Sequence, residues 1–171
     1  MLKLINAFLI FIVATIAHWF AIEIFAPFDI NVGVMFAFSL VMASVLSEGA
    51  GYTFAFVSGL FLDFFGNVLF GGWALTFTLM MIIFYQIDDK IDFKDIGPQF
   101  VITLFLNMAC VILYGLFGKI FTGEFIWQGF KSLLLGSFLT GVLLPLVYLL
   151  VLRYLAFAPF VKINEKNKTI F

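Results

Sequence analysis

Long apolar runs recur from the first residues almost to the end of the 171-residue chain, and they constrain its fold more than any other feature. A helix needs ~20 apolar residues to cross the hydrocarbon layer, where every backbone hydrogen bond must be satisfied within the protein. These runs are too long and too continuous for the strands of a barrel. We therefore predict an all-α integral membrane protein, a single six-helix transmembrane bundle over 1–171.

Glycine, proline or charged residues bound each predicted span. The first apolar segment continues to Phe25 without a convincing cleavage site, so we predict a retained span and not a secretory signal. Only Gly71 and Gly72 separate the third span from the short fourth one, which leaves a re-entrant hairpin as an alternative there. A short polar tail is predicted at 159–171. The predicted spans are 4–25, 30–47, 50–70, 72–87, 98–121 and 132–155.

Positive charge is distributed unevenly over the predicted loops. With six spans, seven of the nine Lys and Arg residues fall on the side that holds both termini, against Lys119 and Lys131 on the other side. Cytoplasmic loops carry the excess of such residues, and acidic residues contribute little to the rule. We therefore predict that both termini and the polar tail lie in the cytoplasm.

Composition and motifs exclude several classes of function. Hydrophobic residues make up 64% of the chain and charged residues 11%, which leaves no room for a soluble domain. The net charge of -1 offers no basic surface for nucleic acid, and the single cysteine, Cys110, has no intrachain disulfide partner. No catalytic motif and no cluster with metal-ligand spacing is present in the sequence. We predict a protein that is not an enzyme and that has no metal and no cofactor.

Small residues form a stripe in the third predicted span. Gly51, Ala55, Gly59 and Asp63 are each four residues apart, so they share one face of a helix. Such a stripe lets a second helix approach closely, either within the bundle or from a partner protein. Asp63 differs from the others, because a carboxylate at this depth costs ~2.5–3.5 kcal/mol on insertion scales and must face protein or water.

Depth along the spans suggests partners for Asp63. His18 lies at a similar fraction of the first span, and Tyr114 and Thr140 lie near that level in the fifth and sixth. We therefore expect a buried polar cluster of Asp63 with one or more of these three side chains. A structural carboxylate, a ligand or proton site and a partner contact all remain open for Asp63.

Two further residues stand out in the last two spans. Asn107, in the middle of the fifth span, is most simply a hydrogen-bonding contact between helices. Pro145 is four residues after Gly141, and it should kink the sixth span.

Two short motifs resemble those of the bacterial rod-shape-determining MreD family. Residues 59–63, Gly-Leu-Phe-Leu-Asp, are similar to the family's G-L-x-x-D, and Gly71, Ala74 and Leu75 match its L-G-x-x-A-L, with Phe70 in place of the first Leu. The resemblance implies a non-enzymatic scaffold of the cell-elongation complex in the bacterial inner membrane. It also implies binding to the bitopic protein MreC and, indirectly, to peptidoglycan synthases and MreB filaments.

The MreD family is also similar in fold to the substrate-binding S components of energy-coupling-factor vitamin transporters, which supply the alternative function. Such a binder needs a pocket with convergent polar groups at its outer loops. Here the predicted outer connections at 26–29 and 71–72 offer few polar groups, and only the loop 122–131 could serve as a lid. The sequence therefore favours the scaffold.

Overall fold

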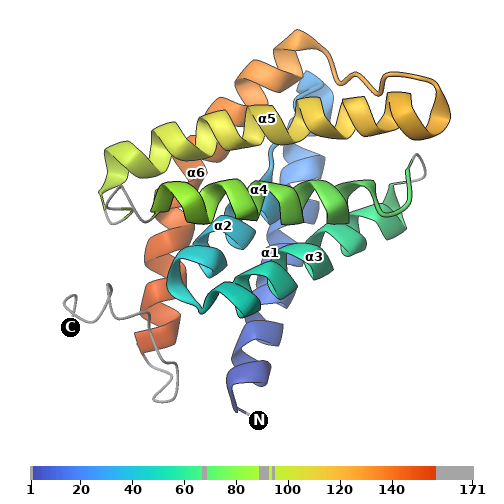
Figure 1. Ribbon diagram of the computed structural model, residues 1–171. Helices are drawn as coiled ribbons and strands as arrows, with labels where there is room; N and C mark the ends of the chain where they lie inside the picture. Colours follow the sequence, from blue (N-terminus) through green and yellow to red (C-terminus); the bar gives the residue numbers. More distant parts are fainter. Residues whose placement is uncertain (1, 67–68, 89–92, 94, 157–171) are drawn as a thin grey trace.

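The structure, a computed structural model, describes residues 2–66, 69–88, 93 and 95–156, so the predicted tail at 159–171 lies outside the described residues. The described chain is helical and contains no strand. Its elements are α1 (Leu2–Phe25), the short 3₁₀ helix η1 (Ala26–Phe28), α2 (Val34–Val45), α3 (Glu48–Phe65), α4 (Gly72–Asp88), α5 (Ile96–Thr122) and α6 (Phe130–Ala156) (Figure 1).

Three segments of the described chain are long and apolar enough to cross a membrane. They are Asn6–Phe28, Ile96–Thr122 and Phe130–Tyr154, and they coincide with the predicted first, fifth and sixth spans. α2 and α4 are apolar but shorter. The structure is therefore that of an all-helical protein with the features of a helical membrane protein.

Helix α2 is the core of the bundle. All 12 of its residues are buried, and it packs against α1, α3, α4, α5 and α6. Its sequence contains no charged residue, as expected for a helix that is covered on every side. The hydroxyls of Ser39 and Ser44 donate to the carbonyl oxygens of Met35 and Val41 in the same helix, each over 2.8 Å. α2 begins at Val34, later than the predicted start at residue 30, and the difference exposes a non-helical segment described below.

The other helices surround α2 in two directions. Figure 1 shows α3, α4 and α5 running roughly alongside one another, with α1 and α6 crossing them steeply. The start of α1 and the end of α6 lie toward the bottom of this view. The α1–α2, α3–α4 and α5–α6 connections lie toward the upper right. One end of the bundle therefore gathers three connections, and these build the candidate site.

The small-residue stripe of α3 is covered by this chain's own helices. Gly51, Ala55 and Gly59 are all buried. A Cβ atom added at Gly59 would lie 2.6 Å from the carbonyl carbon of Trp73 in α4, and one at Gly51 would lie 3.0 Å from the Cα atom of Ala43 in α2. The stripe thus serves close packing within the bundle, and it is not free to receive a partner helix.

Helix α6 continues through Pro145 from Phe130 to Ala156. Gly141, four residues before the proline, packs against α5: a Cβ atom there would lie 3.0 Å from the ring of Phe100. This glycine therefore serves contact between helices as well as accommodating the proline, and the kink at Pro145 stays a prediction.

We expect Gly59→Ala to destabilise the protein strongly, because its added methyl group meets the backbone of Trp73 and Ala74, which cannot move aside as a side chain can. Gly49→Ala is the matched control on the same helix, since nothing lies within 4 Å of a Cβ atom there. Removing a helical glycine should itself stabilise by up to about 1 kcal/mol. Thermal unfolding of both variants in detergent measures the difference, and equal midpoints would contradict the packing of α3 on α4.

Candidate functional site

Asp63 binds the N-terminus of helix α4. Its Oδ1 atom accepts a hydrogen bond from the backbone N–H of Trp73 over 2.9 Å, and its Oδ2 atom accepts one from that of Ala74 over 3.1 Å. The first N–H groups of a helix have no partner within the helix, and that end carries partial positive charge. A buried carboxylate is therefore stabilised here by two charge-assisted hydrogen bonds and by the helix dipole.

The two motifs that carry the family resemblance form one structural unit. Asp63 ends the first motif, and Trp73 and Ala74 belong to the second. Gly71 has a φ angle of 84°, a left-handed conformation that favours glycine, and its carbonyl oxygen accepts the N–H of Leu75 over 3.0 Å. Ala74 is buried, whereas the Leu75 side chain is 43% exposed. The spacing of the motifs thus has a physical reason: the first supplies the cap for the helix that the second begins.

The structure gives Asp63 backbone partners in place of the expected side-chain cluster. Tyr114 comes nearest to the prediction, because its ring stacks on that of Trp73, with centroids 4.0 Å apart. Thr140 instead donates to the carbonyl oxygen of Gly136 and accepts the N–H of Gly33. His18 lines a pocket that does not include Asp63. Sequence depth placed these groups at one level but could not reveal that backbone N–H groups would take the carboxylate.

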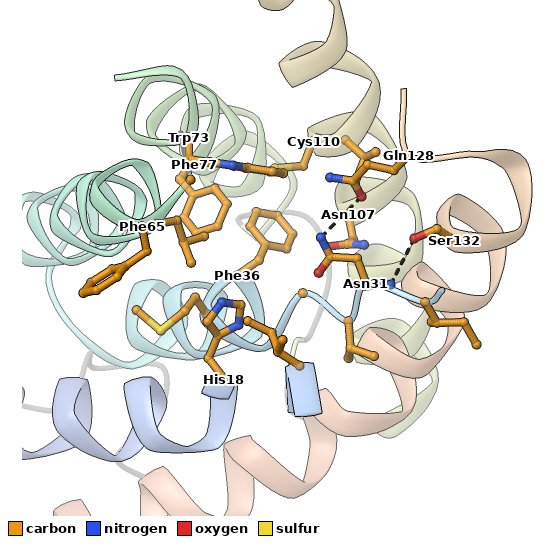
Figure 2. A pocket seen from close by; sticks show the side chains of 18 of the residues that line it. His18, Asn31, Phe36, Phe65, Trp73, Phe77, Asn107, Cys110, Gln128 and Ser132 are labelled. Atoms are coloured by element: carbon orange, nitrogen blue, oxygen red, sulfur yellow. Dashed lines mark hydrogen bonds between the residues drawn. The ribbon is translucent and has the colours of Figure 1, made fainter. Parts of the chain in front are cut away.

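A cavity of about 550 Å³ lies at the end of the bundle where the three connections meet. This volume is in the range of small-molecule sites. Figure 2 shows aromatic rings on one side and amide and hydroxyl groups on the other, with His18 between them. The labelled lining residues are His18, Asn31, Phe36, Phe65, Trp73, Phe77, Asn107, Cys110, Gln128 and Ser132.

A non-helical segment, residues 30–33, forms part of the cavity wall. Backbone polar groups outside helices need partners within the protein in apolar surroundings. Helix α6 provides them: the Ser132 hydroxyl accepts the N–H of Asn31 over 3.0 Å, and the Thr140 hydroxyl accepts the N–H of Gly33 over 2.8 Å. Gly136, midway between these hydroxyls, lets the Asn31 backbone cross α6 closely.

A stripe of small residues on α6 therefore lets another segment pack closely against it, as the glycine stripe does on α3. It consists of Ser132, Gly136 and Thr140. Its residues are spaced by four, a signal that was readable in the sequence. Sequence reasoning missed it because 30–33 was assigned to a helix. The same assignment hid Asn31, whose Nδ2 atom approaches the Oε1 atom of Gln128 at 3.5 Å across the cavity mouth (Figure 2).

Two further contacts hold this end of the bundle together. Lys131 Nζ donates to the carbonyl oxygen of Phe28 over 2.8 Å, which joins the first turn of α6 to η1 in the α1–α2 connection. Asn107 Nδ2 donates to the Ser137 hydroxyl over 2.9 Å, which joins α5 to α6 as the sequence suggested for this asparagine. The segments that form the cavity wall are thus joined to one another by hydrogen bonds.

The lining combines aromatic surface with hydrogen-bonding groups, and Asp29 is its one carboxylate among the described residues. Among the described residues, no three His, Cys, Asp or Glu side chains come together in a way that could hold a metal ion. Cys110, the one free cysteine in the described chain, is buried in the cavity wall.

Comparisons with protein-family models, with curated proteins and with solved structures give no significant match to this chain. Function is therefore inferred from the residues and their arrangement.

We expect Asp63→Leu to unfold or strongly destabilise the protein, because it leaves two buried N–H groups without a partner, at about 1–3 kcal/mol each. Asp63→Asn keeps one acceptor oxygen and should have a milder effect. Phe64→Leu is the matched control, since the neighbouring side chain is 71% exposed. The yield of monodisperse protein and its unfolding midpoint in detergent measure all three, and a Leu variant as stable as the wild type would refute the capping role.

Proposed function

We propose that this chain is a multi-pass scaffold of the bacterial inner membrane, of the MreD type, in the complex that directs cell elongation. The observation that carries the proposal is the pairing of the two motifs. Residues that match the family pattern at 59–63 and 71–75 are joined by the hydrogen bonds of Asp63 to Trp73 and Ala74. The aspartate of the first motif thus has a structural role toward the helix that the second motif begins, which gives the spacing of the two motifs a physical reason and supports the proposal.

The proposal includes six membrane crossings, of which the second needs explanation. Helix α2 alone, with 12 residues, is about 18 Å long, too short for a hydrocarbon layer of ~30 Å. The non-helical residues 30–33 add at most about 13 Å, the length of four fully extended residues at ~3.3 Å each. We propose that the two parts together make the crossing, and the non-helical part is allowed at membrane depth because it is hydrogen-bonded to α6 and lines a cavity.

Both termini are proposed to lie in the cytoplasm, in agreement with the excess of Lys and Arg on that side. The start of α1 and the end of α6 lie toward the same end of the molecule in Figure 1, which supports an even number of crossings. The cavity then opens toward the opposite, external side.

Cysteine labelling of intact cells tests this orientation. We expect Glu124→Cys, in the α5–α6 connection, to react with a membrane-impermeant maleimide from outside. Gly97→Cys, at the other end of α5 and with open space around its Cβ position, should react only after the membrane is permeabilised. The wild type controls for Cys110, which is buried and should stay unlabelled. External labelling at residue 97 would reverse the orientation, and labelling of both positions would contradict a crossing by α5.

The surface proposed for an MreC-like bitopic partner is the outer face of α1. Only 11% of the residues in its most apolar stretch are buried, against 44% for α5 and for α6. Large apolar side chains such as Phe8, Phe20 and Ile24 point away from the bundle, with 62%, 65% and 59% exposure. A helix that its own chain covers so little can pack against a partner helix with no rearrangement of the bundle.

Co-purification with a bitopic coiled-coil protein encoded next to this chain tests the scaffold role. We expect a stable complex that Phe20→Ala, on α1, weakens severalfold through lost helix contact. Phe105→Ala, on α5, is the matched control, because Phe20 and Phe105 are each 65% exposed. Equal retention of both variants would place the interface elsewhere, and failure of the wild type to bind any such protein would contradict the proposed function.

A second candidate function is that of a solute-binding S component of an energy-coupling-factor transporter. The cavity favours it, because three connections at one end of the bundle enclose about 550 Å³ with convergent polar groups. Co-purification separates the candidates: an ATPase pair and a coupling subunit would establish transport, whereas a bitopic coiled-coil partner would establish the scaffold.

A further inference from the structure

The cavity contains a polar atom that this chain leaves unsatisfied. His18 Nδ1 is buried and has no hydrogen-bond partner among the described residues. Buried polar atoms are nearly always hydrogen-bonded, and each exception asks for a partner that the protein alone does not supply. His18 extends from α1 toward the centre of the cavity in Figure 2, so a bound molecule could contact its imidazole.

The aromatic wall is arranged to receive a flat group. Phe36 and Phe77 meet edge to face, with centroids 5.2 Å apart, and Phe77 meets Trp73 in the same way at 5.8 Å. One face of the Trp73 indole is covered by Tyr114. Trp73 also lines the cavity, where Figure 2 shows its ring edge-on above Phe77. A ring placed against this wall would gain both apolar burial and favourable aromatic geometry.

Apart from Asp29, the polar wall is built of uncharged side chains. Asn31, Asn107, Gln128 and Ser132 provide amide and hydroxyl groups, and the described lining contains no Lys or Arg. Asp29, at the α1–α2 connection, is the one carboxylate in that lining. An anion entering this cavity would lose its hydration with no cation to pair with and a carboxylate at the wall. The lining therefore selects against negative charge.

We propose that the cavity is a binding site for an uncharged small molecule that carries an aromatic ring and a polar amide-like edge. The ring lies against Trp73, Phe77 and Phe36, and the polar edge hydrogen-bonds with the His18 imidazole and the amide side chains opposite. This site goes beyond the scaffold function. For the second candidate function, a solute-binding subunit, the site rests on that function and adds the class of solute that the subunit would bind.

A matched pair of probes tests the proposal with the full chain in detergent. 1-Naphthamide is uncharged and 1-naphthoate has the same ring with a carboxylate. We expect the amide to raise the unfolding midpoint in a concentration-dependent way, and the acid to bind at least about tenfold more weakly, a difference of ~1.4 kcal/mol. No shift with the amide, or equal shifts with both probes, would overturn the proposal.

The variant His18→Leu locates the binding. Since it removes an unsatisfied polar atom, the unliganded protein should fold and be at least as stable as the wild type, while its response to naphthamide falls several-fold. Phe20→Leu, on the outward-facing side of α1 with 65% exposure and outside the cavity lining, should respond as the wild type does. An unchanged response in His18→Leu would place the binding outside this cavity.

Native mass spectrometry of the purified wild type adds an independent outcome. A phospholipid that co-purifies with the wild type, is displaced by naphthamide and is absent from His18→Leu would assign the cavity to lipid and would overturn the proposal. The naphthamide measurement uses the isolated chain, whereas the scaffold proposal is tested by complex formation, so either can fail while the other stands.

Discussion

The hydrogen bonds between the Asp63 carboxylate and the first N–H groups of α4 determine much of the arrangement around them. They fix where α4 begins relative to the end of α3. The close approach of these helices at Gly59 depends on the same register, because Gly59 faces the backbone at Trp73 and Ala74. Trp73 in turn carries Tyr114 on one face and forms part of the cavity wall. A single buried carboxylate thereby links the packing of α3 on α4 to the shape of the cavity.

The non-helical residues 30–33 also have backbone N–H groups that need partners within the protein. At α4 a side chain of the preceding helix, α3, satisfies N–H groups at a helix end, whereas here the hydroxyls of Ser132 and Thr140 on α6 satisfy N–H groups of a segment without helix. In both places a glycine on the supporting helix, Gly59 or Gly136, lets the two backbones approach. At both places, small residues spaced by four allow close backbone contact, and a polar side chain in the same stripe accepts the backbone N–H groups.

The sequence predicted the helical class, because apolar runs of helical length leave few other structures open. The predicted ranges were less accurate for α2, which begins at Val34 and not at residue 30, and for α3, which ends at Phe65 and not at residue 70. Asn31 and Gly33 are poor helix formers, but a single glycine and asparagine in an apolar run do not by themselves predict a non-helical segment. The tertiary partner that holds this segment, the Ser132–Thr140 stripe, is about a hundred residues away along the chain.

The candidate site was only partly predictable for the same reason. The need to satisfy Asp63 follows from its position in an apolar run, but a backbone N–H group has no signature in the sequence, so side chains at equal depth were the natural candidates. Of these, the Tyr114 ring stacks on Trp73, whereas Thr140 accepts the N–H of Gly33 and His18 lines the cavity. The connections predicted at 26–29 and 71–72 were expected to offer few polar groups. That expectation missed Asn31, because the predicted helix began at residue 30 and therefore included it.

Helix α1 connects the two proposed activities. It is the helix least covered by its own chain, and it presents Phe20 outward while His18 lines the cavity on its other side. Under the two proposals, a partner helix and a bound small molecule would contact opposite faces of one weakly attached element. A ligand that holds α1 in the position the partner prefers strengthens partner binding, and the partner must then strengthen ligand binding by the same factor. The short stretch of α1 from His18 to Phe20 is therefore where binding in the membrane plane and binding in the cavity would be coupled.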